Sequence, residues 1–165
     1  MYRTIEDFLR DWKYESDATL RMIKTLTDES LGQECAPNSR SLGFLAWHIT
    51  LTLGEMGGKA GLNVSGPEED APLPSSASAI ASAYEMGAQS VASEVRKWTD
   101  SMLAEKINMY GEQWTRSATL ASLVKHQIHH RAQMTMLMRQ AGLTVPGVYG
   151  PSREEWAKLG MQAPQ

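Results

Sequence analysis

The chain has 165 residues, of which 42% are hydrophobic and 21% are charged, and its net charge is −3. This length and apolar content predict one globular domain, residues 1–165, with a core of its own. The negative charge and the scattered cationic residues argue against a general nucleic-acid-binding protein. No segment has the roughly 18 consecutive apolar residues that a membrane span needs.

The sequence contains one cysteine, Cys35, so an internal disulfide framework is excluded. Without a neighbouring base, Cys35 is interpreted as an inert small residue and not as a nucleophile. Charged residues such as Asp7 and Arg10 interrupt the apolar residues near the start, so no secretory signal is expected. We therefore expect a cytoplasmic protein.

The first predicted helix spans residues 4–27. Thr4 and Asp7 have the spacing of a capping box. Ser16 and Thr19 interrupt its apolar stripe. We interpret both hydroxyls as bonded back to helix carbonyls, and the alternative is that they line a polar pocket. Residues 28–40 are predicted to form a loop.

The second predicted helix, residues 41–58, is apolar on two sides. One arc contains Leu42, Leu45, Ile49, Leu53 and Met56, and the other contains Phe44, Trp47 and Leu51. Such a helix is buried on both sides or carries a surface for a partner chain. His48 lies where the two arcs meet. Glu55 follows on its side of the helix, either as an acid–base group or as a solvated carboxylate.

The middle of the chain combines a long loop with a third helix. Residues 59–75 are rich in Gly, Pro, Ser and acidic residues, which is typical of a long connection. Apolar residues at spacings of three and four predict a helix over residues 76–100. In residues 101–116, Tyr110–Glu112 is typical of a turn between short extended pieces.

The fourth predicted helix, Ser117–Gly142, contains three of the four histidines. Ser117 is its predicted N-cap, and Gly142, with Pro146 soon after, is its predicted stop. Its apolar residues fall within an arc of roughly 140° at 100° per residue. They are Leu120, Leu123, Val124, Met134, Leu137, Met138 and Ala141.

The helical angles separate the histidines of this segment. His126 and His130 are four residues apart, so both project from the apolar face, whereas His129 points roughly 100° away from His130. Two imidazoles at this spacing can converge on one metal ion, but two core histidines with hydrogen-bond partners would give the same pattern. Both interpretations remain open from spacing alone.

Three further polar residues of this helix lie near the pair. Gln127 and Arg131 fall on the broad apolar arc, so a buried guanidinium must find partners. Structural pairing with a carboxylate or with loop carbonyls is the first interpretation, and a substrate carboxylate is the second. Gln133 borders His126 and is expected to hold it.

The four apolar-periodic segments together predict the fold. We expect an all-α, antiparallel four-helix bundle with long connections. A capping box at Ser152–Glu155 predicts a short C-terminal helix that ends near Leu159.

Two blocks of the sequence resemble the DinB superfamily. They are RSLGFLAWHI at residues 40–49, and HQIHHRAQ at residues 126–133 followed by LMRQAGLTVPGVYGPSREEW. The remaining segments match that family in layout only. Ala132 departs from the HHRGQ that the family often has, but its side chain should point away from the histidine face.

The resemblance implies a four-helix bundle, usually a homodimer, with a divalent metal held by one histidine of the second helix and two of the fourth. Transferred to this chain, the ligands are His48, His126 and His130. Three imidazoles are typical of an open, catalytic type of site. Zinc or nickel is expected first, and iron or manganese stays open. Binding should weaken as pH falls through about 6.5, where histidine takes up a proton.

The resemblance also implies the function. Relatives transfer a low-molecular-weight thiol to an electrophile, and hydrolysis of an ester or amide is the variant expected at the same kind of site. A non-catalytic stress protein that binds metal or a small ligand is the alternative. The sequence assigns no catalytic residue or general base. The expected partners are a small-molecule substrate and a second copy of the chain, with no nucleic acid and no membrane.

Overall fold

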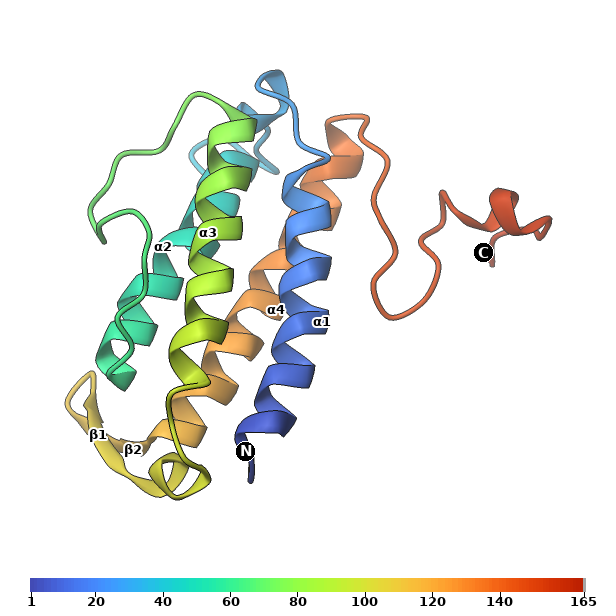
Figure 1. The fold of residues 1–165 in the computed structure, drawn as a ribbon. Coiled ribbons are helices and arrows are strands. Elements are labelled where there is room, and N and C mark those ends of the chain that lie inside the picture. The colour runs from blue at the N-terminus through green and yellow to red at the C-terminus, as the bar shows by residue number, and fades with distance from the viewer. Residues whose placement is uncertain (165) are drawn as a thin grey trace.

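A computed structural model describes residues 1–164, and four long helices form its body (Figure 1). Their bounds are Ile5–Ile23 for α1, Leu42–Ala60 for α2, Ala77–Val95 for α3 and Arg116–Gln140 for α4. Helix α1 packs against α3 and α4, and α2 packs against the same two helices. The prediction of an all-α four-helix bundle is confirmed.

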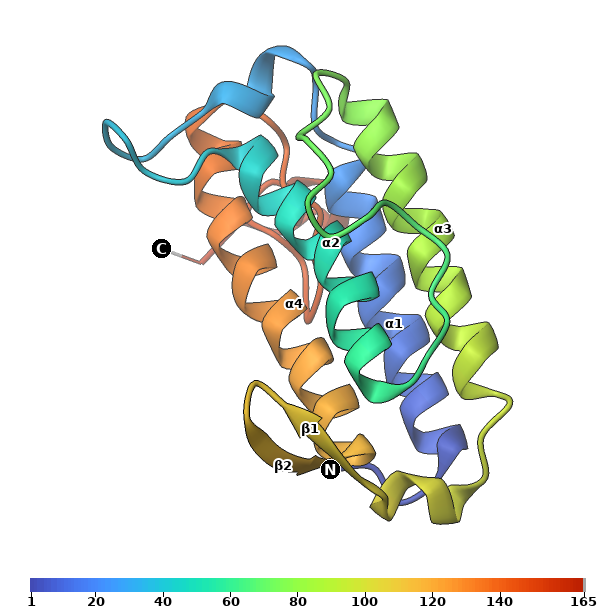
Figure 2. The same cartoon turned by 90° about the vertical axis from the view of Figure 1, so that its left-hand side faces the viewer.

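The long connection between α2 and α3 sets the direction of the helices. It runs back along the outside of the bundle, so that α3 starts at the same end as α2 (Figures 1 and 2). Helices α2 and α3 therefore run in one direction, and α1 and α4 run in the other. The antiparallel packing expected for the bundle holds for the pairs α1–α3 and α2–α4, whereas α2–α3 and α1–α4 are parallel. The Asp28 carboxylate accepts a hydrogen bond from the Ala77 amide at 2.7 Å and fixes the start of α3.

This crossover also explains the two apolar arcs of α2. Trp47 is 7% exposed, and its indole N–H donates to the Ala71 carbonyl of the crossover at 2.8 Å. Leu51 packs against the core as a partly buried residue, whereas Phe44 is 41% exposed. The chain itself therefore covers most of the second arc.

Two predicted helices are longer than the observed ones. The structure ends α1 at Ile23 and α3 at Val95, and tighter turns follow in which Leu26 donates to the Ile23 carbonyl and Trp98 to the Val95 carbonyl. Leu26 is buried and Trp98 packs against the core. The apolar spacing therefore continues past the last helical residue, because the residues of the following turns are also packed against the core.

A β-hairpin precedes α4. Strand β1, Lys106–Met109, pairs antiparallel with β2, Glu112–Thr115, and Met109 stands opposite Glu112. The two turn residues, Tyr110 and Gly111, both have positive φ, 53° and 88°, as a type I′ turn requires. The predicted turn and its extended flanks are confirmed.

The cap of α4 differs from its prediction. Thr115 is the N-cap, because its hydroxyl accepts from the Ala118 amide at 3.1 Å. Ser117, the predicted cap, lies inside the first turn and donates to the Tyr2 carbonyl at 2.8 Å. The helix starts earlier because β2 leads directly into it. Gly142, with φ 75°, ends the helix as predicted.

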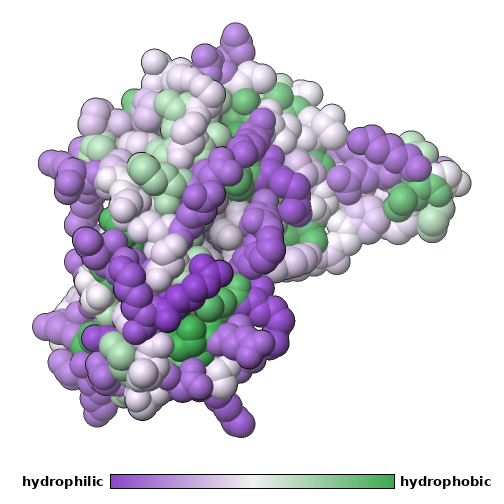
Figure 3. Space-filling model, in the orientation of Figure 1, coloured by the Kyte–Doolittle hydropathy of each residue, from purple (hydrophilic) through white to green (hydrophobic). Residues whose placement is uncertain are grey.

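The chain after α4 leaves the bundle and projects to one side (Figures 1 and 3). The Ser152 amide donates to the Glu155 carboxylate at 3.1 Å, and a short 3₁₀-helix, Trp156–Leu159, follows. Hydrophilic residues cover much of the face drawn in Figure 3, with hydrophobic residues between them. Within residues 1–164, no helix has the length and apolar content to cross a membrane.

Candidate metal centre

The histidines of α2 and α4 meet between these two helices. His126 Nε2 lies 3.1 Å from His48 Nε2 and 3.1 Å from His130 Nε2. One ring nitrogen from each residue lies within 4.8 Å of the others. The structure therefore brings together the three residues that the sequence selected, two from adjacent turns of α4 and one from the facing helix.

Neighbouring side chains orient two of the rings. Gln133 Oε1 lies 2.8 Å from His130 Nδ1, and because an amide oxygen only accepts, this nitrogen carries the proton. The Nε2 lone pair of His130 is then directed to the cluster. Phe44 stacks on His48 with ring centroids 5.9 Å apart and 13° between the ring planes.

Gln133 was expected beside His126, and this prediction is wrong, since its partner is His130. Phe44 was missed as a site residue and assigned to a partner surface. Its spacing of four from His48 could have shown that the two rings stack on one helix face.

Burial keeps the three imidazoles uncharged. Loss of hydration is the largest cause that lowers the pKa of each ring, and for His126 the value falls to about 4. The other imidazoles and the Arg40 guanidinium lower the pKa of His126 further. The Gln133 hydrogen bond opposes the shift at His130. At neutral pH all three rings therefore offer lone pairs.

The other candidate residues lie outside the cluster. His129 is exposed, and its Nε2 lies 3.3 Å from the Gln133 amide nitrogen. Glu55 accepts a hydrogen bond from the Tyr110 hydroxyl at 2.6 Å, which ties the hairpin to α2. Cys35 is exposed and lies 3.4 Å from the Ser39 hydroxyl.

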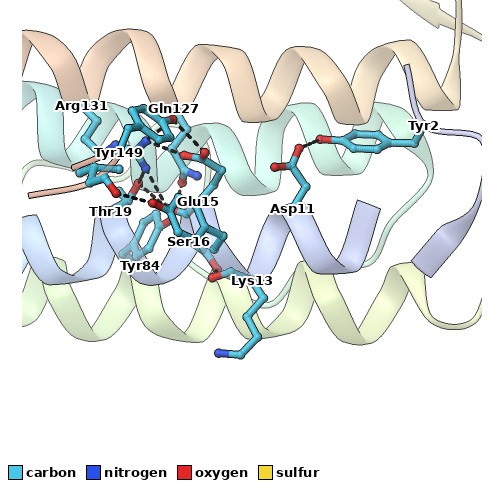
Figure 4. Close-up of polar contacts among 12 residues, drawn as sticks. Tyr2, Asp11, Lys13, Glu15, Ser16, Thr19, Tyr84, Gln127, Arg131 and Tyr149 are labelled. Atoms are coloured by element: carbon cyan, nitrogen blue, oxygen red, sulfur yellow. Dashed lines mark hydrogen bonds and ion pairs between the residues drawn. The ribbon is translucent and has the colours of Figure 1, made fainter. Parts of the chain in front are cut away.

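A buried ion pair joins α4 to α1 at Arg131, the residue that follows His130 in the sequence (Figure 4). Arg131 Nη2 is 2.5 Å from the Glu15 carboxylate, and Arg131 Nη1 donates to the Glu15 carbonyl and to the Thr19 hydroxyl at 2.9 and 3.0 Å. The Tyr149 hydroxyl accepts from Arg131 and donates to Glu15, both at 2.8 Å. The structural interpretation of Arg131 is confirmed, because its buried guanidinium is already paired with a carboxylate of the same chain.

Hydroxyls of α1 behave as predicted. Thr19 donates to the Glu15 carbonyl at 3.0 Å, and Ser16 donates to the Lys13 carbonyl at 3.4 Å. Gln127, on the same face of the network, accepts a hydrogen bond from the buried Tyr84 hydroxyl (Figure 4). Thr19 and Gln127 are buried in an interior polar layer. Ser16 and Tyr84 also line a cavity of about 420 Å³ between α1 and α3, so the alternative that α1 contributes to a pocket holds for Ser16.

The cluster fits a divalent ion. Two atoms that are each 2.0–2.1 Å from one ion stand about 2.8–3.4 Å apart for angles from 90° to tetrahedral. The two separations from His126 Nε2, both 3.1 Å, lie in this range, and the three ring nitrogens together lie within 4.8 Å of one another. The donor set is three neutral imidazoles, which suits a borderline metal and leaves coordination positions open. A divalent metal can therefore bind here, and the donor set does not select which one.

The pKa shifts predict how the metal-free protein responds to acid. The unfolded chain takes up protons on histidine below pH of about 6.5, whereas His126 in the folded chain does so only near 4. The unfolded state therefore binds more protons in this window, and stability should fall as pH is lowered through it.

The measurement is the melting temperature at pH 7 and pH 5 with a chelator present. His126→Gln removes the imidazole whose pKa is lowered to about 4, so the melting temperature of this variant should fall less between these pH values. An equal fall in melting temperature for the natural protein and the variant would show that His126 is not the source of the pH dependence. For the same reason, metal binding should persist to lower pH than the sequence suggested.

Comparison with known proteins gives consistent matches over the whole chain. The sequence profile of the DinB family matches residues 1–164. The uncharacterized protein YrdA of Bacillus subtilis (strain 168) is 45% identical over 166 residues, which cover 100% of this chain and 99% of YrdA.

Two crystal structures are similar to the fold. A DinB-like protein from Bacillus cereus ATCC 10987 is 46% identical, with a TM-score of 0.83 over 90% of this chain and 100% of its own. The DinB-like protein YjoA from Bacillus subtilis is 16% identical, with a TM-score of 0.69 over 88% of this chain and 99% of its own. At that identity, the likeness to YjoA shows the fold alone.

Proposed function

The chain belongs to the DinB family, and from this premise we propose that it is a divalent-metal protein whose ion is bound by His48, His126 and His130. The observation that carries the proposal is the convergence of their ring nitrogens, with His126 Nε2 at 3.1 Å from both others. Zinc or nickel is the first choice, because three imidazoles suit these ions, and iron or manganese is the second.

The chain's own residues prepare the site for a ligand. Burial keeps the imidazoles neutral, so no proton has to be lost from them before they bind an ion near pH 7. Gln133 fixes the proton of His130 on Nδ1 and so leaves Nε2 free. Phe44 covers one face of His48 and limits the rotation of that ring.

We propose that the reaction is transfer of a low-molecular-weight thiol to an electrophile, with hydrolysis of an ester or amide as the related variant. A bound ion would supply a Lewis acid that lowers the pKa of a thiol or water beside it. The open side of a three-histidine set leaves space for such a partner. The family relationship supports this proposal, and the arrangement of donors is compatible with it.

One observation favours a non-catalytic alternative. Within residues 1–164, the cluster contains imidazoles only, with no carboxylate or thiol among its members. The site thus lacks an evident general base. A protein that stores or senses a metal or a small ligand, for example under stress, would need none.

The deciding experiment measures metal content and activity together. The purified protein should contain close to one equivalent of divalent metal, and a panel of small thiols and electrophiles should show turnover. His126→Ala should lose both metal and turnover. Full metal content without turnover on the panel would favour the non-catalytic alternative, and absence of metal from the natural protein after supplementation would contradict the proposal.

We also propose that two copies of the chain associate. The exposed Phe44 ring supports this, although Trp47 and Leu51 of the same arc pack within one chain. Sedimentation at micromolar concentration should give about twice 18.3 kDa. A species at the monomer mass would contradict the dimer.

A further inference from the structure

A cavity of about 370 Å³ lies at the end of the bundle where α2 begins. The loop before α2, the first turns of α2 and the last turns of α4 line it, and it is partly open to solvent. Figure 2 shows these three segments at the same end of the bundle. Leu45, Met136 and Leu137 give it apolar walls, and Arg40 and Gln133 are its long polar side chains. This volume suits a small molecule and not a macromolecule.

The cavity adjoins the histidine cluster. Gln133 lines the cavity and also contacts His130 Nδ1 at 2.8 Å. The Arg40 guanidinium lies 5.2 Å from the centre of the Phe44 ring, and that ring stacks on His48. The charge of Arg40 is near enough to lower the pKa of all three imidazoles. The cavity is therefore joined to the cluster through Gln133 and through the contacts from Arg40 to Phe44 and from Phe44 to His48, while the three histidines themselves do not line it.

Arg40 has no countercharge within the described part of the chain. None of the ion pairs among residues 1–164 includes it, and its side chain rests on Phe44. Arg131 and Arg139 each pair with a glutamate, whereas Arg3, Arg21, Arg96 and Arg153, like Arg40, take part in none of these ion pairs. Arg40 differs from those four by lining the cavity beside the cluster. The positive charge of Arg40 and a divalent ion bound by the histidines would repel each other unless an anion lay between them.

We propose that this cavity binds the substrate of the three-histidine site and selects molecules with a carboxylate and an apolar chain. Arg40 pairs with the carboxylate, for which its planar fork is suited. The apolar chain lies on Leu45, Met136 and Leu137. A carboxylate fits better than a phosphate, because one exposed arginine supplies the charge and the walls are largely apolar. This inference names the substrate class of the proposed function and rests on it.

The test measures binding without turnover. Octanoate and the uncharged octanamide are titrated by calorimetry into the protein, both metal-free with chelator and loaded with zinc. In each form octanoate should bind about tenfold more tightly than octanamide, which is the difference expected for a hydrogen bond to a charged group. The metal-free form isolates Arg40 from any direct contact between carboxylate and metal.

Two variants test whether Arg40 is the residue that pairs with the carboxylate. Arg40→Met keeps the apolar stem and removes the charge, so the preference for octanoate should vanish in the metal-free protein. Arg10→Met is the matched control, because Arg10 is an exposed arginine of α1 that pairs with Asp7. It should keep the preference. No preference in the natural protein, or one that persists in Arg40→Met, would overturn the inference.

Zinc stoichiometry on the same samples separates the two proposals. Normal zinc binding without an Arg40-dependent preference would refute the cavity assignment and leave the metal site intact. An Arg40-dependent preference in a protein that binds no zinc would support the carboxylate cavity and refute the proposed metal function. Because Arg40 is exposed, its replacement should leave the circular dichroism spectrum unchanged.

Discussion

His126→Ala should abolish tight metal binding, while His129→Ala should leave it unchanged. His126 is the central member of the cluster, since its Nε2 is 3.1 Å from both other imidazoles. Loss of a residue that supports a metal ligand typically lowers affinity by about 10–100-fold, and loss of a ligand itself should exceed this. The measurement is metal stoichiometry after dialysis, followed by competition with a coloured chelator.

Gln133→Ala provides a graded control for this prediction. It removes the acceptor of the His130 Nδ1 proton but no ligand. Affinity should therefore fall by about 10–100-fold while stoichiometry at saturating metal stays at one. If His129→Ala loses metal and His126→Ala keeps it, the three-histidine site is refuted.

Glu15→Ala should unfold the protein far more easily than the natural sequence unfolds. The carboxylate and the Arg131 guanidinium are both buried, with side chains 5% and 3% exposed. Removing one partner leaves a charge without compensation in the interior, which costs about 3–5 kcal/mol of unfolding free energy. This is a large part of the total stability of about 5–15 kcal/mol that domains have. Urea denaturation followed by circular dichroism measures it.

Asp17→Ala is the matched control on the same helix. Asp17 pairs with Lys13 at 2.7 Å, but both side chains are more than half exposed, at 52% and 77%. Its loss should cost about 0–1 kcal/mol. A double change, Glu15→Leu with Arg131→Met, should recover most of the stability, because no unpaired charge remains. Equal losses of unfolding free energy for Glu15→Ala and Asp17→Ala would show that breaking the buried ion pair does not cause the loss.

The pair on α4 could be predicted because helical geometry is local. A spacing of four residues fixes His126 and His130 on one face whatever the rest of the chain does. His48 could not be assigned in this way, because its position depends on how α2 packs against α4. Only the resemblance to a family identified it beforehand.

The error at Gln133 has a similar physical origin. Side chains in a helix lean toward its N-terminus and reach the residue three or four positions before. Gln133 therefore reaches His130, whereas His126 lies two turns away. The helical angle alone placed Gln133 beside His126, and the direction of the side chain explains why its partner is His130 instead.

The direction of α3 also lay beyond the sequence. A loop of this length can either return quickly or follow the whole length of a helix, because an extended chain covers about 3.3 Å per residue and a helix only 1.5 Å. The contact of Trp47 with the Ala71 carbonyl selects the second path. No pattern within residues 59–75 indicates that contact.

Tyr149 has a consequence for the order in which the protein is completed during synthesis. The last helix of the bundle ends at Gln140, yet the Tyr149 hydroxyl from the following segment bridges Glu15 and Arg131. A nascent chain that has released all four helices from the ribosome still lacks this bridge. The interior charge pair therefore gains its last partner only after the segment that follows α4 has also left the ribosome. Emergence of the four helices alone should not give the bundle its full stability.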